Sequence, residues 1–335
     1  MRSRVLRKPS AGKRRHRVSL LVGLCLAACV VAGGAVRAEV TPVERRGTRQ
    51  GGKGLVHLVD ADLETAAHRY KQTPQGDLSL HFHFPPGWKR SDKRPAILFF
   101  FGGGWRNGTA QQFMPQAEYF ATRGLVAVRA DYRILNEHNT TPDIATEDAK
   151  SAMRWLRGHA DEFGINPERI IASGGSAGGH LAAATLLVDT CDAATDDTAI
   201  SSKPNALVLF NPALNLTLVG DREMKGADGR DIKREISPTL FLTEPTVPTV
   251  IFCGDADALK AHGDEFLEKA VALGMRCEQW VAPGQPHGFF NRQPWISATT
   301  IEADRFLVSL GYLSGEPTLE PADPKAALQL QTPSK

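Results

Sequence analysis

Three side chains in this sequence could together carry out nucleophilic catalysis: a serine, an aspartate and a histidine, in that order along the chain. Ser176 lies in Gly174-Gly175-Ser176-Ala177-Gly178, which matches the G-x-S-x-G pattern of a sharp strand-to-helix turn that exposes a serine hydroxyl. Asp257 and His287 each follow a later apolar segment. A histidine can take the proton of the serine hydroxyl, and a carboxylate can orient the histidine. These residue types therefore predict a serine nucleophile with an acid–histidine pair behind it.

The serine motif needs its context, because glycine-rich chains produce G-x-S-x-G strings by chance. Here a short apolar strand is predicted over 170–173, and an Ala/Leu-rich helix over 181–187 follows the turn directly. The alternative is a glycine-rich turn that binds phosphate. Against that alternative, the stretch has neither the lysine of a P-loop nor a clean G-x-G-x-x-G with a later acid. The helix N-terminus behind Ser176 would offer free N–H groups to an anionic intermediate.

The elements that must position these side chains alternate between apolar strands and amphipathic helices. Strands are predicted over 78–84, 96–101, 125–130, 170–173, 206–210, 249–253 and 277–281, and helices over 116–122, 144–163, 181–187, 262–273 and 298–310. This alternation predicts an α/β fold with a mostly parallel sheet and helices on both faces, with 78–84 in an antiparallel edge hairpin. Residues 213–246 are charged and weakly periodic, which indicates an insertion over the active-site edge.

The chain resembles serine esterases of the α/β-hydrolase superfamily, in the acetyl-esterase and feruloyl-esterase-like branch near the hormone-sensitive-lipase group. The resemblance covers about residues 65–312. It rests on Phe101-Gly102-Gly103-Gly104-Trp105, Asp131-Tyr132-Arg133, the block 163–170, the serine turn, Gly254-Asp255-Ala256-Asp257 and Pro286-His287-Gly288-Phe289. It implies an α/β-hydrolase fold with a mostly parallel eight-stranded sheet and a Ser176, Asp257, His287 triad that uses no metal or organic cofactor.

The resemblance also assigns expected roles to single residues. The family places its acid three residues after the glycine of the acid loop, which favours Asp257 over its neighbour Asp255. Backbone N–H groups would hold the oxyanion. Aromatic side chains would line the acyl pocket, although they could equally belong to the core. These candidates are Gly103, Gly104 and Ala177 for the oxyanion, and Trp105 and Phe289 for the pocket. The Asp131-Tyr132-Arg133 block would have a structural role near the oxyanion loop.

Two departures from the family pattern stand out. Phe101 occupies the position before the three glycines where the family usually has histidine, so the hydrogen bond by which that histidine would fix the loop is absent. The residue before Ser176 is Gly175, where the hormone-sensitive-lipase group commonly has aspartate. The second departure favours the sugar-ester side of the family.

The first 38 residues carry the positive charge of the chain. They hold nine Lys/Arg and no Asp/Glu, so the remainder has 31 basic and 37 acidic residues and a net charge of −6. That remainder offers no basic surface for nucleic acid. A basic segment over 2–17, an apolar run over 18–36 and the small residues of Val36-Arg37-Ala38 predict a secretory signal over 1–38 that is cleaved after Ala38. This signal predicts a secreted, periplasmic or envelope location. The alternatives to cleavage are that the apolar run stays as a membrane anchor or that Cys29 is lipidated. Contact with a membrane is expected only through one of these two.

The rest of the chain divides into a flexible leader over 39–64, the hydrolase domain over 65–312 and a Pro/Ala/Glu-rich tail over 313–335 that is predicted to be disordered. Cleavage would remove Cys25 and Cys29. Cys191, Cys253 and Cys277 would remain, without zinc-type spacing and with at most one disulfide among them.

These observations predict a carboxylesterase that acts on short acyl esters, with acetyl groups on polysaccharide or its fragments as the expected substrate. Two alternatives remain open. A peptidase of the same superfamily would usually carry a large extra domain, for which this 335-residue chain has no room. A non-catalytic ligand-binding member would ordinarily have lost a triad residue, and none is missing here.

Overall fold

The computed structural model of this chain describes residues 56–220 and 223–332. The predicted signal segment, Cys25, Cys29 and the first part of the predicted leader lie outside the described residues. Within the described ranges, no helix is both long and apolar enough to cross a membrane.

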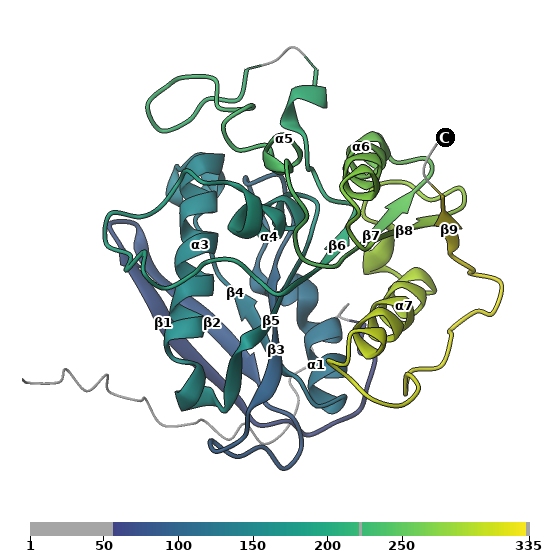
Figure 1. Ribbon diagram of the computed structural model, residues 1–335. Coiled ribbons are helices and arrows are strands. Elements are labelled where there is room, and N and C mark those ends of the chain that lie inside the picture. The colour runs from purple at the N-terminus through teal and green to yellow at the C-terminus, as the bar shows by residue number, and fades with distance from the viewer. Residues whose placement is uncertain (1–55, 221–222, 333–335) are drawn as a thin grey trace, which may run out of the picture. The chain divides into compact units, whose positions relative to one another are not determined.

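In the described part of the chain, nine strands form a single sheet (Figure 1). They are β1 (Thr65–Thr73), β2 (Gly76–His83), β3 (Arg94–Phe100), β4 (Val126–Ala130), β5 (Ile165–Gly175), β6 (Ala206–Phe210), β7 (Thr249–Gly254), β8 (Cys277–Ala282) and β9 (Gln329–Gln331). Their order across the sheet is β1-β2-β4-β3-β5-β6-β7-β8-β9. The strands from β4 to β8 in this order run parallel, whereas β1, β2 and β9 pair antiparallel at the two edges. The mostly parallel α/β sheet and the antiparallel edge hairpin are confirmed.

Helices cover both faces of the sheet. They are α1 (Met114–Thr122), α2 (Leu135–His138), α3 (Pro142–Gly158), α4 (Ala177–Leu187), α5 (Pro238–Phe241), α6 (Lys260–Ala272) and α7 (Trp295–Ser309), with short 3₁₀ helices η1 (Ala110–Phe113), η2 (Ala160–Phe163), η3 (Leu216–Leu218) and η4 (Phe289–Asn291). One face packs against α3, α4 and α6, and the other against α1 and α7 (Figure 1).

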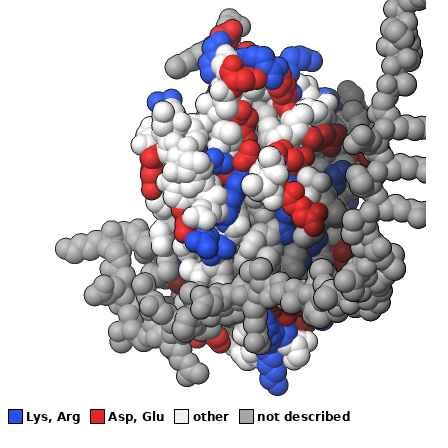
Figure 2. Space-filling view, turned by 90° about the vertical axis from the view of Figure 1, so that its left-hand side faces the viewer, with Lys and Arg blue, Asp and Glu red and all other residues white. Residues whose placement is uncertain are grey.

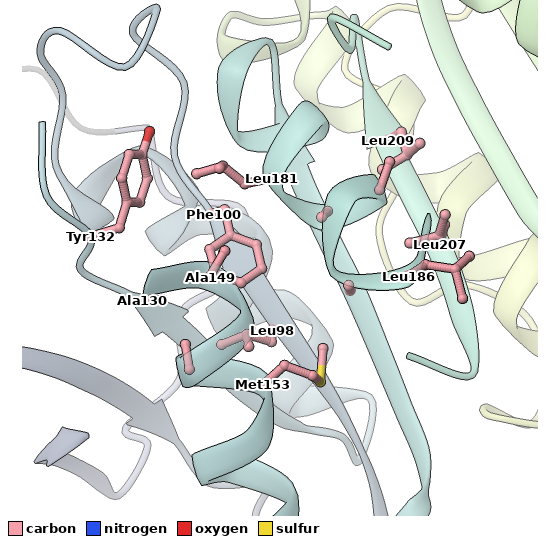
Figure 3. Packing of buried hydrophobic residues seen from close by; sticks show 14 of the residues in the cluster. Leu98, Phe100, Ala130, Tyr132, Ala149, Met153, Leu181, Leu186, Leu207 and Leu209 are labelled. Carbon is pink, nitrogen blue, oxygen red and sulfur yellow. The ribbon is translucent and has the colours of Figure 1, made fainter. Parts of the chain in front are cut away.

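Strand β3 shows how the sequence builds these two layers. Its five residues from Ala96 to Phe100 are all buried, and successive side chains of a strand point to opposite faces. Leu98 and Phe100 belong to the core on the α3–α4 side, while Ile97 and Phe99 belong to the core on the α1–α7 side. Figure 3 shows Leu98 near Met153 and Phe100 near Ala149, both of α3. A continuously apolar run therefore becomes a central strand, as the sequence predicts.

The two ends of the described chain differ from expectation. The predicted disordered tail contains β9, which pairs with β8, and Leu313 within it is buried in the core. The prediction was wrong here because β8 would otherwise leave an open sheet edge with unpaired N–H and C=O groups. The end of the predicted flexible leader is also packed: Leu58 and Leu63 contact the core on the α1–α7 side. The described sheet has nine strands where eight were expected, and β9 is the additional strand.

Charged groups on the hairpin side of the sheet are paired rather than segregated by sign. Figure 2 shows acidic and basic side chains interspersed over the face that is on the left in Figure 1. Beneath it, Lys71 of β1 and Arg133 both contact the fully buried carboxylate of Asp148, at 2.8 and 2.7 Å. A buried carboxylate needs such partners, since an isolated one would be very costly. This pairing fixes the segment after β4 against α3.

The three cysteines in the described residues, Cys191, Cys253 and Cys277, are free thiols, so the disulfide left open by the sequence is not formed among them. Burial raises the pKa of the Cys253 thiol and keeps it protonated. These cysteines behave as apolar packing residues.

Candidate active site

Ser176 lies at the apex of the turn between β5 and α4, with φ 54° and ψ −117°. Such a conformation is strained for a residue other than glycine, and it is kept only where the surroundings impose it. They do so because the first turn of α4 packs closely on both β5 and β3: a Cβ on Gly174 would lie 2.3 Å from the Gly178 carbonyl oxygen, and a Cβ on Gly178 would lie 2.0 Å from the carbonyl oxygen of Phe100 in β3. The Ser176 N–H donates to the Phe210 carbonyl at 2.9 Å. The turn predicted from G-x-S-x-G thus presents the hydroxyl on a rigid support.

The structure brings Ser176, His287 and Asp257 into one hydrogen-bonded series. His287 Nε2 lies 2.9 Å from Ser176 Oγ, and His287 Nδ1 lies 2.8 Å from Asp257 Oδ2. The Asp257 side chain is 1% exposed, whereas that of His287 is 43% exposed and open to substrate. Asp257 Oδ1 accepts the Leu259 N–H at 2.8 Å. The carboxylate is therefore held at both oxygens and fixes the orientation of the imidazole.

Asp255, the competing acid, contacts neither triad partner. Its Oδ1 accepts the Gly284 N–H at 2.5 Å, which joins the loop after β7 to the loop after β8. The structure thus separates the two acids: Asp257 contacts the histidine, and Asp255 contacts only the backbone of the neighbouring loop.

The glycine loop follows β3 directly and lies against the serine. A Cβ on Gly102 would be 3.4 Å from Ser176 Cβ and 2.8 Å from the Gly175 carbonyl oxygen. Within the described ranges, no acceptor takes the N–H groups of Gly103, Gly104 or Ala177. Unpaired N–H groups near a nucleophile are what an oxyanion requires.

Two side chains hold this loop where the family histidine is missing. The Tyr132 hydroxyl donates to the Phe101 carbonyl at 2.6 Å, and the two rings stack with centroids 4.0 Å apart. Burial raises the pKa of Tyr132, so its hydroxyl stays a donor. Gln112 Oε1 accepts the Gly102 N–H at 2.5 Å. The loop is therefore anchored at two successive residues without the histidine.

Trp105, expected in the acyl pocket, is 8% exposed and packs edge-on against His180 of α4, with ring centroids 5.0 Å apart. His180 Nε2 donates to the Ile236 carbonyl at 2.6 Å, which ties the 213–246 insertion to α4. Burial lowers the pKa of His180 to about 4, so the ring is neutral at pH 7. The aromatic pair is thus a packing unit behind the glycine loop.

Phe289, the other expected pocket residue, lines a depression of about 240 Å³ beside His287. Arg292 and Trp295 form other parts of its wall. The Phe289 and Trp295 rings meet edge-to-face with centroids 6.0 Å apart. The depression opens next to the imidazole, on the protein segment that connects His287 to α7.

Three residues of the site carry no signal that the motifs above detect. Asn211 Oδ1 accepts the Gly288 N–H at 3.1 Å and so holds the residue after His287. A polar residue directly after the buried strand β6 could have indicated Asn211, by the same reasoning that identified Asp257. Gln112 and Asn291 lie in 3₁₀ helices, where nothing in the sequence pattern distinguishes them.

Two buried histidines should make the fold sensitive to acid. Burial lowers the pKa of His180 to about 4 and, with the positive charge of Arg129, that of His83 to about 3, against 6.5 for a free side chain. As the pH falls, these histidines are protonated in the unfolded chain before they are protonated in the folded one. Their contribution to the free energy of unfolding is therefore complete above pH 6.5 and is lost as the pH falls toward 4. We expect the free energy of unfolding to fall by up to about 1.4 kcal/mol per pH unit for each histidine.

Urea unfolding at pH 7, 6 and 5 measures this slope. His83→Gln removes one titration and keeps an acceptor for the Arg129 guanidinium, which now donates to His83 Nε2 at 3.0 Å. This variant should show a smaller slope than the wild type, while His180 and the buried His262, whose pKa burial also lowers, continue to titrate. An unfolding free energy that is constant over this range would contradict the assignment of two neutral buried histidines.

Comparison with known proteins agrees with this geometry. The BD-FAE family model matches residues 80–264. The carboxylesterase NlhH of Mycobacterium tuberculosis is 26% identical over 260 residues, which span 70% of this chain and 78% of that protein. Esterase 2 of Thermogutta terrifontis, in a structure phosphorylated by paraoxon, is 42% identical with a TM-score of 0.71, covering 75% of this chain and 96% of the other. Its propionate-bound structure is 41% identical with a TM-score of 0.69, at 75% and 96% coverage.

No group of three or more His, Cys, Asp or Glu side chains in 56–220 and 223–332 is arranged to hold a metal ion. The chemistry of the site is that of a hydroxyl, an imidazole, a carboxylate and backbone N–H groups. Together with a family model that covers more than half of the chain and the 42% identity to a solved esterase, this shows that the chain belongs to the BD-FAE family of α/β-hydrolases and is a carboxylic ester hydrolase.

Proposed function

We propose that this chain hydrolyses short-chain acyl esters, in particular acetyl groups on carbohydrate, with Ser176 as nucleophile. The observation that carries the proposal is the unbroken series Asp257–His287–Ser176, with hydrogen bonds of 2.8 and 2.9 Å at the carboxyl ends of parallel strands. Each residue has the neighbours that its role needs, and none of the three is replaced.

In the first half of the reaction, Ser176 Oγ attacks the ester carbonyl carbon and gives its proton to His287 Nε2. Asp257 stabilises the imidazolium that forms and keeps its Nε2 directed at the serine. The negative charge on the former carbonyl oxygen is taken by the N–H groups of Gly103, Gly104 and Ala177, whose removal would cost about 3 kcal/mol or more each. The intermediate collapses, and the leaving alcohol takes the proton back from His287.

In the second half, a water molecule takes the place of the alcohol. His287 removes a proton from it, and the oxygen attacks the acyl carbon of the acyl-serine. The same N–H groups hold the second oxyanion. When the bond to Ser176 Oγ breaks, His287 returns the proton to the serine, and the carboxylic acid leaves. Each residue is thereby restored to its starting protonation state.

A solved relative supports a short acyl group. Esterase 2 of Thermogutta terrifontis has been solved with propionate and with butyrate bound, and its chain aligns with 75% of this one. Propionate and butyrate are short-chain carboxylates, which hydrolysis of short-chain acyl esters would release.

The carbohydrate part of the proposal is supported by the depression beside His287. The leaving alcohol must lie near His287 Nε2, because that atom protonates it. Trp295 offers an aromatic surface to a sugar ring, and the exposed Arg292 guanidinium has no hydrogen-bond acceptor in the described part of the chain. The BD-FAE family name, which denotes acetyl xylan and feruloyl esterases, is consistent with a sugar-ester substrate. A feruloyl group is the second acyl candidate.

We also propose that the chain acts outside the cytoplasm. The basic segment over 2–17, the apolar run over 18–36 and the small residues before Ala38 support export, and an extracellular polymer would then be within reach.

Hydrolysis of p-nitrophenyl acetate, butyrate and octanoate, followed by acetate release from acetylated xylan, tests the proposal. We expect kcat/KM to be highest for the shorter acyl groups and acetate to be released from the polymer. Trp295→Ala should lower kcat/KM on the acetylated polymer more than on p-nitrophenyl acetate. A preference for octanoate would contradict the short-acyl assignment, and equal losses on both substrates would contradict the role of Trp295 in binding sugar.

A further inference from the structure

A continuous series of hydrogen bonds joins the glycine loop to the loop that carries His287. The Gly102 N–H donates to Gln112 Oε1 at 2.5 Å, and Gln112 Nε2 donates to Asn291 Oδ1 at 3.1 Å. Asn291 Nδ2 then donates to the Gly288 carbonyl at 3.0 Å. Gly288 directly follows His287. Two carboxamide side chains, 179 residues apart in sequence, thus connect the two loops that flank the serine.

The orientation of both carboxamides is determined by the ends of this series. A backbone N–H can only donate, so the oxygen of Gln112 must face Gly102. A backbone carbonyl can only accept, so the nitrogen of Asn291 must face Gly288. The two remaining amide atoms then meet as donor and acceptor. Rotation of either amide by 180° would break two hydrogen bonds at once, so this arrangement is the one that satisfies every group.

The contact between the two side chains is supported by packing on either side. Gln112 lies in η1 and Asn291 in η4, and the next residue of η1, Phe113, stacks on Phe290 with ring centroids 5.7 Å apart. Strand β4 anchors η1 through Arg129, whose Nη1 donates to the Ala110 carbonyl at 2.9 Å. The link therefore joins two short helices that are themselves fixed to the core.

Gly288 is held from both sides. Its carbonyl accepts from Asn291, and its N–H donates to Asn211 Oδ1 at 3.1 Å. Its φ of 80° is in the left-handed region that favours glycine, so the chain turns sharply just after the histidine. Small rotations of this peptide would move the imidazole relative to Ser176, and displacements of about 1 Å can cost about 100-fold in rate.

From this geometry we propose that Gln112 and Asn291 are positioning residues that set the glycine loop and His287 in a fixed relation to each other. The glycine loop stabilises the oxyanion and His287 transfers the proton, so both must be aligned with the same reacting carbonyl. This chain lacks the histidine that the family usually has before the glycines. The hydrogen bonds of Gln112 and Asn291 take over part of that histidine's role of fixing the glycine loop. The inference rests on the proposed serine mechanism and adds residues that the motifs do not include.

A double-mutant cycle tests the link. Gln112→Met and Asn291→Leu keep similar side-chain volumes and remove the carboxamides. We expect each single variant to lower kcat on p-nitrophenyl acetate by about tenfold or more, since each leaves polar groups unpaired at the site. KM should change little, because the change affects the transition state more than substrate binding. The double variant should lose no more than the worse single variant, because the same link is already broken.

Gln111→Met is the matched control: it is the preceding residue of η1, is exposed, and should keep the wild-type kcat. Multiplying losses in the double variant would show that the residues act independently, and an unchanged kcat with a lowered unfolding temperature would show a purely structural role. Either result would overturn the proposal. Ser176→Ala, measured in parallel, separates it from the proposed function: if that variant stays active, the serine mechanism itself fails.

Discussion

Replacing Ser176 with alanine is expected to lower kcat on p-nitrophenyl acetate by about 10⁴-fold or more. The substitution removes the only oxygen placed 2.9 Å from His287 Nε2 among the described residues, and with it the acyl-enzyme. The backbone at this position keeps its hydrogen bonds to Phe210 and His180, so the turn should persist. Initial-rate kinetics on purified protein, with circular dichroism to verify folding, measure the effect.

The remaining activity of this variant is informative as well. Groups that bind the oxyanion act without the nucleophile, so a small residual rate above the uncatalysed reaction is expected. Activity within about tenfold of the wild type would contradict the assignment of Ser176 and would direct attention to another nucleophile.

Replacing Asp257 with asparagine should lower kcat by about 10⁴-fold, while substrate binding stays nearly unchanged. Asparagine fits the same space but can present its N–H₂ group to His287 Nδ1, which favours the wrong tautomer of the ring. It also removes the charge that stabilises the imidazolium. The large effect follows from the burial of the carboxylate, which is 1% exposed, because water cannot replace it.

Asp255→Asn provides the control for this prediction. Asparagine retains an oxygen that can accept the Gly284 N–H, and Asp255 contacts neither His287 nor Ser176. We expect its kcat/KM to stay within about twofold of the wild type. If Asp255→Asn were the more damaging variant, the acid of the triad would have been assigned to the wrong residue.

The triad could be proposed from the sequence because each of its members lies in the turn or loop that follows an apolar strand. Ser176, Asp257 and His287 follow β5, β7 and β8, whose carboxyl ends lie at one edge of the sheet. The order of the strands and the side-chain types together leave few arrangements. The same logic applies to Asn211 after β6, which shows that the rule extends to a residue outside the known motifs.

The support of the glycine loop could be predicted only in part. The resemblance gives the Asp131-Tyr132-Arg133 block a structural role near this loop, and Tyr132 does hold it, whereas nothing in the sequence indicates Gln112. Phe101 in place of histidine indicates a missing hydrogen bond, yet the structure supplies Tyr132 and Gln112 from other elements. Such partners depend on how η1 and the segment after β4 fold against the sheet, and hydrogen bonds between distant side chains leave no periodic pattern. Strand β9 was not predicted for a related reason. Its three residues form a strand because they pair with the free edge of β8, and not because of a pattern in their own sequence.

Ser176 is the residue that should become covalently modified during the reaction. Esterase 2 of Thermogutta terrifontis has been solved phosphorylated by paraoxon, and the same reagent should react with this chain. After incubation with paraoxon, peptide mapping by mass spectrometry should find a diethyl phosphoryl group on Ser176, in proportion to lost esterase activity, and none in Ser176→Ala. Loss of activity with the label on another residue, or full activity after exposure to excess paraoxon, would contradict the account.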